Sequence, residues 1–403
     1  MTGVRTAILF DQPGFAIDTR LIVFDFEFHV NSTILRLYSQ FFRKFLDRYD
    51  ATRDPSNAKS SFLYEYILKG DGDGVYGLQP LRSTTSTGPT EASYLISSII
   101  IEMLGQTSDE DPSETIATPF DELKETRSLE QLMNAFYMKS STLQNLGELE
   151  KLVQTADFYG ALPIVSTFVE ANLHNSKELC TSMGDGHISD VVKTLCLARK
   201  LKAATLFREA FIYVISCCED EEGYEEVMDE LTSQDNEDLI PLVNLYYARL
   251  CRKITEAHFF IIKCCMDHQY VLRQQDSTIQ EKQTAIISEV IRNGIQPIIG
   301  EDSPKFSAEF FNNVCRAPFT PTSEQALRYG EVTQSEDGVA VLSRRLQKET
   351  VKHVKKALWP VLRDETQFCI NGAEYETSSK YDIFVCTVLH ERDLPWLSGS
   401  AAS

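Results

Sequence analysis

The hydrophobic pattern between residues 18 and 47 predicts two strands followed directly by a helix. Arg20 to Phe24 is a short apolar run, and from Phe24 to Val30 apolar residues alternate with polar ones, a period of two that is typical of a strand with one buried face. Asp25 marks a turn between the two strands. From Asn31 the apolar positions recur at three and four residues, which places them on one face of a helix. These positions are Ile34, Leu35, Tyr38, Phe41, Phe42 and Phe45. We expect Asn31 or Ser32 to cap this helix.

Further elements are expected up to residue 137. Residues 6–10 form a short apolar piece that suits an extra edge strand, and residues 61–68 and 75–78 suit a hairpin. Residues 92–104 predict an amphipathic helix between polar loops. Residues 120–137 predict another helix. Its expected inward face consists of Leu123, Leu129, Leu132, Met133 and Phe136.

The pattern of the second half is mainly helical. An amphipathic helix ends near Gly160, Pro163 begins the next, and helical periodicity returns from Leu179. Residues 220–238 form a strongly acidic stretch that we interpret as a connector, and 240–272 and 284–298 predict helices.

The last hundred residues suggest a different organisation. Residues 301–340 are interpreted as loop-rich because of their prolines, and residues 341–358 predict an amphipathic helix that Trp359 and Pro360 stop. Asn371-Gly372 is a strong hairpin signal, and residues 381–390 suit a third strand of a small terminal sheet.

Composition narrows the class of protein. A length of 403 residues suggests two or three domains, and a hydrophobic share of 43% with 23 Phe is enough for sizeable cores. The formal charge of −20 argues against nucleic acid and anionic membrane as partners. No apolar run approaches the roughly 20 residues of a transmembrane helix, and residues 1–12 lack the apolar core of a signal peptide. The ten cysteines follow helical patterns, so we expect reduced thiols in an intracellular protein, cytoplasmic or nuclear.

Three blocks of the sequence together resemble one known family. The order Asp18, Leu21, Val23, Phe28, Val30, Leu35, Ser39, Phe42 is similar to the opening of a BTB/POZ domain. Residues 146–173 resemble the end of the same domain, and residues 195–215 resemble the helical extension of its fungal branch. The resemblance implies an α+β domain at about 15–175, with an insertion at about 50–119. A helical extension at 176–300 and a loop-rich tail at 301–403, with one helix and a small sheet, would follow.

The family resemblance also implies a function, namely non-catalytic protein–protein interaction as a scaffold or adaptor, commonly as a homodimer. Transcriptional members use a charged pocket in which Asp18 matches the acid, but Ser32 stands at the basic position and Asn31 at the usual histidine. Ubiquitin-ligase adaptors bind a cullin through a hydrophobic-x-acid motif, and residues 136–141 carry no acid. A cullin adaptor and a transcription-associated regulator therefore stay as alternatives. The partner-binding candidates are Asp18, Tyr38, Phe41, Phe42 and Tyr137.

The aromatic candidates have a second interpretation. Tyr38, Phe41, Phe42 and Phe45 supply aromatic area of the kind found at interface centres, but the same side chains suit the core of the domain itself. Both interpretations are kept at this point.

No enzymatic or cofactor motif stands out. A phosphate-binding glycine loop, a nucleophile elbow and HExxH are absent, so we expect neither an enzyme nor a cofactor. His258, Cys265 and His268 share one helical face and suit zinc by ligand type, yet the sequence names no fourth ligand and a packed helix is the preferred interpretation.

Two further groups of residues have ordinary explanations beside functional ones. The vicinal pairs Cys217-Cys218 and Cys264-Cys265 lack the spacing of a redox or zinc motif and suit buried positions. A basic flank lies on the predicted helix 341–358 and suits either solvent, an acidic partner or the acidic stretch 220–238. It consists of Arg344, Arg345, Lys348, Lys352, Lys355 and Lys356.

Overall fold

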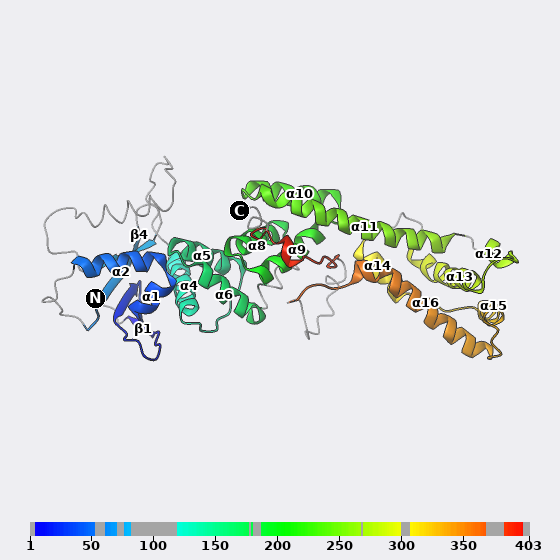
Figure 1. Ribbon diagram of the computed structural model, residues 1–403, viewed down its shortest axis with the longest axis horizontal. Helices are drawn as coiled ribbons and strands as arrows, with labels where there is room; N and C mark the ends of the chain where they lie inside the picture. The colour runs from blue at the N-terminus through cyan, green and yellow to red at the C-terminus, as the bar shows by residue number, and fades with distance from the viewer. Residues whose placement is uncertain are drawn as a thin grey trace. The chain divides into compact units, whose positions relative to one another are not determined.

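The structure is a computed structural model that describes residues 5–52, 61–70, 76–81, 119–176, 179, 187–266, 269–299, 307–367 and 383–397. The chain divides into two units, Met1–Ser176 and Lys177–Ser403, each of which is described by itself (Figure 1). The second unit includes both stretches that the sequence pattern separated at residue 300. The protein is a mixed α+β chain, with its described strands in the first unit.

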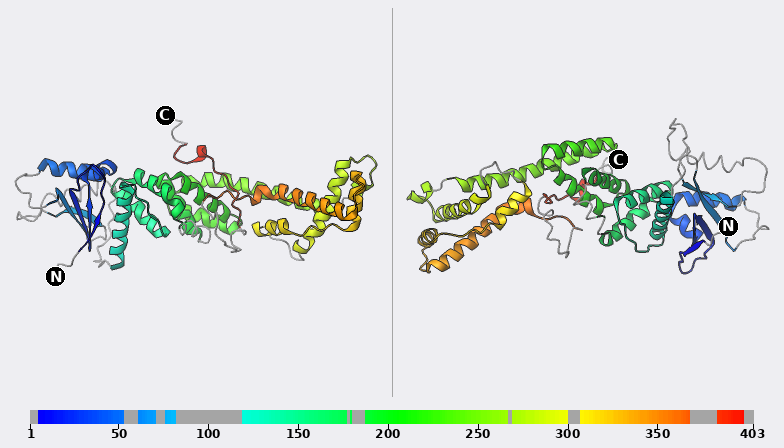
Figure 2. Two further views of the ribbon diagram at one scale, coloured as in Figure 1. Left: turned by 90° about the horizontal axis from the view of Figure 1, so that it is seen from below. Right: turned by 180° about the vertical axis from the view of Figure 1, so that it is seen from behind.

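A five-stranded sheet with the order β1-β3-β2-β4-β5 organises the first unit (Figure 2). Its strands are β1 (Thr6–Leu9), β2 (Thr19–Val23), β3 (Phe26–Val30), β4 (Tyr64–Gly70) and β5 (Tyr76–Pro80). The β2–β3 and β4–β5 pairs are antiparallel, whereas β1 runs parallel to β3 and β4 runs parallel to β2. The predicted strands and the edge position of β1 are therefore confirmed. Strands β4 and β5, expected at 61–68 and 75–78, lie within the stretch 50–119 and belong to the sheet.

The turn between β2 and β3 holds a residue in an unfavourable backbone conformation. Phe24 has a φ of +49°, a left-handed conformation that costs a residue with a Cβ about 1–2 kcal/mol. Its ring packs edge-on against Tyr76 of β5, with the centroids 5.4 Å apart. This contact offsets part of the backbone cost and fixes the turn against the far strand of the sheet.

The helices of the first unit follow the predicted order, with one division. They are α1 (Ser32–Tyr38), α2 (Gln40–Thr52), α4 (Pro119–Phe136), α5 (Leu146–Phe158), α6 (Leu162–Asn172) and the 3-10 helix η2 (Leu173–Asn175). The single helix expected over 31–47 was wrong, because Ser39 is extended and separates α1 from α2. Helix 120–137 is confirmed as α4, although Leu123 is 61% exposed and does not face inward as expected.

Ser39 breaks the helix because its side chain has partners elsewhere. Its hydroxyl donates to the Tyr159 carbonyl oxygen at 2.6 Å and accepts from the Phe42 backbone N–H at 3.1 Å. The second bond caps the first turn of α2. The first bond joins the α1–α2 junction to the corner between α5 and α6, where Gly160 adopts a φ of +60°. A Cβ at Gly160 would lie 3.1 Å from the Gln40 Cβ, so the close approach also favours glycine.

The second unit is helical throughout its described elements. These are α8 (Ile188–Leu201), α9 (Ala204–Cys217), α10 (Glu221–Ser233), η3 (Glu237–Leu239), α11 (Ile240–Cys265), α12 (Gln269–Arg273), α13 (Ile279–Ile299), α14 (Ala308–Arg316), α15 (Ser323–Thr333), α16 (Val339–Leu362) and η5 (Glu391–Asp393). The acidic stretch 220–238, interpreted as a connector, contains α10 and most of η3. Asp220 caps α10 by accepting from the Gly223 N–H at 2.9 Å. No helix among the described residues combines the length and apolar character needed to cross a membrane.

The tail contains more regular structure than its prolines suggested. Three helices, α14, α15 and α16, occupy the stretch where one was expected. Thr322 and Gln325 form a capping box at the start of α15, so the prolines before it mark a connector and not a long loop. Helix α16 contains Pro360 and ends at Leu362, two residues beyond the expected stop.

Residues 383–397 pack against the helices of this unit without forming a strand. Phe384 is fully buried and lies near Phe311, and Trp396 packs edge-on against Phe207 with the centroids 5.3 Å apart. Tyr246 donates to Asp393 at 2.7 Å, so polar bonds also hold the segment. The strand expected at 381–390 is not present in its described part, 383–390, and the Asn371-Gly372 hairpin and the helix at 92–104 lie outside the described residues.

Candidate protein interface

Asp18, the acid of the expected charged pocket, has partners within its own unit. Its carboxylate accepts from the Ser32 backbone N–H at 2.7 Å, from the Ser32 hydroxyl at 2.6 Å and from the Thr19 hydroxyl at 3.1 Å. The Ser32 N–H is one of the unpaired donors at the start of α1. Asp18 therefore holds the beginning of this helix, and Ser32 supplies hydrogen bonds where a basic residue would supply charge.

Asn31 and Tyr137 form a buried polar pair beside this helix start. The Tyr137 hydroxyl donates to Asn31 Oδ1 at 2.8 Å and accepts from the Asn31 backbone N–H at 2.7 Å. The Asn31 amide donates in turn to the Ala16 carbonyl oxygen at 2.8 Å. Asn31 is thus not the side-chain cap that was expected, because its side chain is used for this pair.

Burial sets the ionisation of the same tyrosine. Removal from water raises the pKa of Tyr137 to about 12, although the Asn31 N–H opposes this by favouring the phenolate. The hydroxyl is therefore protonated at neutral pH, as its bond to Asn31 Oδ1 requires. Tyr137 acts as a structural residue between β3 and the end of α4.

The aromatic candidates lie mostly in the core of the first unit. Phe42 is fully buried and stacks on Tyr159, with the centroids 5.4 Å apart and the rings at 4°. Phe41 is 7% exposed and meets Tyr159 edge-on, while Tyr38 is half-buried and stacks on Phe136 at 6.0 Å. Of the two interpretations of these rings, core or interface, Phe41 and Phe42 fit the core, because both are buried within this chain. Tyr38 keeps part of its side chain at the surface.

The segment after α4, where a cullin contact was considered, presents Met138, Lys139 and Ser140 to solvent. Phe136 and Tyr137 are buried, whereas Met138 is 58% exposed and has a left-handed φ of +51°. Lys139 is also exposed, and its ammonium lies 4.3 Å from the Phe10 ring centroid. The Lys139 Nζ donates to the Leu9 carbonyl oxygen at 3.4 Å, which joins this segment to β1.

Strand β1 is the most exposed part of the sheet. It pairs with β3 on one side, and Leu9 at its end is 57% exposed. The Thr6 and Phe10 backbone N–H groups point toward β3 and donate to the carbonyl oxygens of Asp25 and His29, each at 2.9 Å. Because strand residues alternate, the backbone groups of Ala7 point to the outer edge. The sequence pattern predicted the strand, but an exposed Met138 next to it depends on the fold and had no sequence signal.

The structure describes two of the three residues of the zinc candidate, His258 and Cys265. The His258 ring stacks on Phe311 at 5.5 Å, burial lowers the pKa of His258, and Cys265 is exposed. His268 lies outside the described residues. Within the part of the chain that the structure describes, no three His, Cys, Asp or Glu side chains are placed to hold a metal ion.

One cysteine of each vicinal pair is buried as expected, whereas Cys217 is partly exposed and Cys265 is exposed. Cys218 and Cys264 are buried, and burial raises the pKa of Cys218 to about 12 and the pKa of Cys264 to about 11. Both groups are therefore thiols and not thiolates at neutral pH, which makes them weak nucleophiles.

The basic flank predicted on the helix 341–358 lies on the surface of α16. All six of its lysines and arginines are exposed, while Leu342, Leu346 and Leu358 on the opposite side are buried. Within the described residues, Lys352 of this basic flank forms an ion pair with Glu349, with 3.8 Å between the ammonium nitrogen and a carboxylate oxygen.

Comparison with known proteins identifies no relative. No model of a protein family matches the chain, no curated protein matches it, and no solved structure matches it.

Proposed function

We propose that the chain is a non-catalytic protein–protein interaction module, a scaffold or adaptor, that pairs with a second copy through its first unit. The observation that carries this proposal is the outer edge of β1, along which no other strand pairs within the described residues. An edge strand presents unpaired backbone groups that form hydrogen bonds readily with a strand of another chain.

Apolar surface next to this edge favours the same function. Leu9 and Met138 are both more than half exposed, and the Lys139–Leu9 bond brings their segments together. Covering exposed apolar side chains lowers the free energy of association by about 25 cal/mol for each Å² removed from water. Backbone pairing along β1 would therefore be accompanied by burial of Leu9 and Met138.

The resemblance to BTB/POZ domains supports the proposal independently of the edge strand. The strand-turn-strand-helix opening and the α5–α6 helix pair have the order that the resemblance implies. Members of that family commonly dimerise and act as scaffolds. The pairing of Asp18 with Ser32 in place of a basic residue makes a corepressor-type charged pocket the weaker alternative.

The solution mass of the full chain tests this proposal. Light scattering on a sizing column is expected to give twice the chain mass of 45.7 kDa. The same run with the amino-terminal region of a ligase cullin separates the two roles. A mass increase would assign the adaptor role, despite the absence of an acid near Lys139, and an unchanged dimer would assign a scaffold that binds other proteins. A monomer would overturn the proposal.

A further inference from the structure

We infer that the exposed face of α16 is a docking surface for a short acidic protein segment that carries an apolar residue. The inference rests on the proposed function in treating the chain as a protein-binding module, but it concerns the second unit and not the β1 edge. It adds the chemistry of a partner, which the first unit does not reveal.

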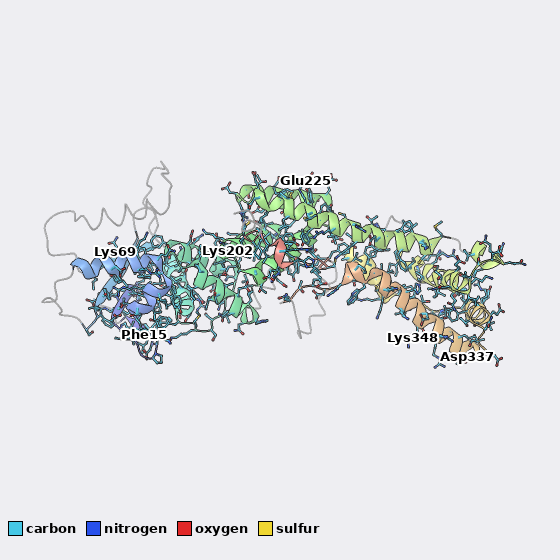
Figure 3. The ribbon with its side chains drawn as sticks, in the orientation of Figure 1. Phe15, Lys69, Lys202, Glu225, Asp337 and Lys348 are labelled. Atoms are coloured by element: carbon cyan, nitrogen blue, oxygen red, sulfur yellow. The ribbon has the colours of Figure 1, made fainter. Side chains whose placement is uncertain are left out.

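The first argument is the arrangement of charge on this helix. At 100° per residue, the six basic positions from Arg344 to Lys356 fall within about 120° of the helix circumference and extend over about 18 Å of its length. Glu349 lies at the border of this arc, and its contact with Lys352 is a surface ion pair of small energy. Figure 3 labels Lys348 on this helix. A concentrated positive field therefore lies on a chain whose total charge is −20.

The second argument is an exposed apolar residue at each end of the same arc. Trp359 and Val341 have the same angular position as the centre of the basic arc, but they lie beyond its two ends along the helix axis, and they are 60% and 49% exposed. An exposed tryptophan one turn after Lys355 and Lys356 is unusual for a purely solvated face, because covering its ring removes apolar area from water and lowers the free energy. The combination suits a ligand in which an apolar side chain lies next to a row of carboxylates.

The third argument separates a protein segment from other anions. A membrane-bound amphipathic helix inserts its apolar face into lipid, but the apolar face of α16 is already buried in the second unit through Leu342, Leu346 and Leu358. Nucleic acid extends beyond a patch of about 18 Å and would meet the acidic surface of the same chain. A short acidic segment matches both the length and the sign of the patch.

Binding is tested with a fluorescein-labelled peptide of about 14 residues, which spans a similar length as a helix. It carries glutamates at four-residue intervals and one leucine next to them near its end, and a control peptide carries glutamine in place of the glutamates. The full chain is titrated by fluorescence anisotropy at low and high salt. The acidic peptide should bind and weaken with salt, since exposed charges are screened, and the glutamine peptide should not bind.

Two variants with equal change in net charge show where the peptide binds. Lys348→Glu with Lys352→Glu should weaken binding about tenfold or more. The matched control is Lys44→Glu with Lys202→Glu, both exposed and outside α16, and it should bind as the unchanged chain does. Circular dichroism verifies that each variant is folded.

The tryptophan gives a local signal. In a Trp396→Phe chain, Trp359 is the remaining tryptophan, so its emission should shift to the blue when the peptide covers it. An unshifted emission on binding would overturn the location.

Four other results would overturn the inference. They are the absence of binding at low salt, an equal loss in the two charge-reversed chains, and tighter binding of an oligonucleotide or of phosphatidylserine vesicles to the same face. The fourth is salt-sensitive self-association through Lys348 and Lys352, which would assign the face to the acidic α10 of a second copy. Dimer mass is recorded for every variant, so a failure of peptide binding remains distinct from a failure of the first unit to pair.

Discussion

Asn31 and Tyr137 lie 106 residues apart in the chain and exchange two buried hydrogen bonds, one through the Asn31 backbone and one through its side chain. Asn31 directly precedes α1, and Tyr137 directly follows α4. The pair therefore fixes the junction between β3 and α1 to the end of α4. Any surface built from β1 and Met138 depends on this connection.

Replacement of Tyr137 by phenylalanine should destabilise the first unit by about 2–4 kcal/mol, because it leaves a buried N–H and a buried amide oxygen without their partner. Both tryptophans lie in the second unit, so tryptophan fluorescence does not report this loss. Hydrogen exchange of peptides covering β3 and α1 is the suitable measurement. Tyr224→Phe is the matched control, since its hydroxyl bonds to Asn244 at an exposed site, and it should change exchange little.

Alkaline pH should destabilise the first unit through the same tyrosine. The pKa of Tyr137 is raised by burial to about 12, above the value of about 10 for an unfolded chain. Because the pKa is raised in the folded state, protonated Tyr137 contributes its full stabilisation of the folded first unit below pH 10, and this contribution is lost as pH rises through 12. Burial likewise raises the pKa of Tyr159.

Circular dichroism and tyrosinate absorbance, recorded between pH 8 and 12, should show a folded first unit in which Tyr137 and Tyr159 stay protonated while exposed tyrosines ionise near pH 10. A Tyr137→Phe chain should lose part of this pH dependence and keep the part due to Tyr159. Ionisation of Tyr137 with the ordinary pKa of an exposed phenol would contradict its buried position.

Ser39→Ala should cost about 1–2 kcal/mol in the stability of the first unit, since it removes the cap of α2 together with the bond to the Tyr159 carbonyl. Chemical denaturation followed by circular dichroism measures this change. Thr167→Ala is the control, because the Thr167 hydroxyl is exposed and bonds within its own helix. A Ser39→Ala chain as stable as the control would show that the break between α1 and α2 has another cause.

Phe384→Ala should destabilise the second unit by about 3–5 kcal/mol, the usual cost of deleting a fully buried phenyl ring. Trp396 emission reports the result, because this residue packs on Phe207 beside the same segment. Val388→Ala, at a position that is 42% exposed, should leave both the denaturation midpoint and the emission nearly unchanged. If the two variants behave alike, residues 383–397 do not hold the second unit together.

The parts of the fold that the sequence predicted are those that local pattern determines. Alternation specifies β3, a short apolar run specifies β2, and the spacing of Leu129, Leu132 and Phe136 specifies α4. The capping box of Thr322 and Gln325 is also a local signal, and it marks the start of α15 in spite of the prolines before it.

Other features depend on residues far apart in the chain. Ser39 is extended because its hydroxyl reaches Tyr159, and periodicity alone contains no information about a partner 120 residues away. Pro360 lies near the end of α16 and lacks the backbone N–H that would donate to a carbonyl oxygen one turn earlier. The loss of this bond costs little free energy there, because the residues on that side of the helix are exposed to water. The same limit applies to the site, since exposure separates Phe42 in the core from Met138 at the surface, and exposure follows from tertiary packing.

The most direct test of the central claim is the solution mass of a chain with Ala7→Pro. Proline at residue 7 removes an outward N–H of β1 and blocks pairing at that edge, while the bonds from Thr6 and Phe10 to the β3 side remain. Ala7→Val changes the same exposed position but keeps the N–H. The account predicts a folded monomer for Ala7→Pro and a dimer for both Ala7→Val and the unchanged chain. A dimer that persists in the proline variant would contradict pairing through β1.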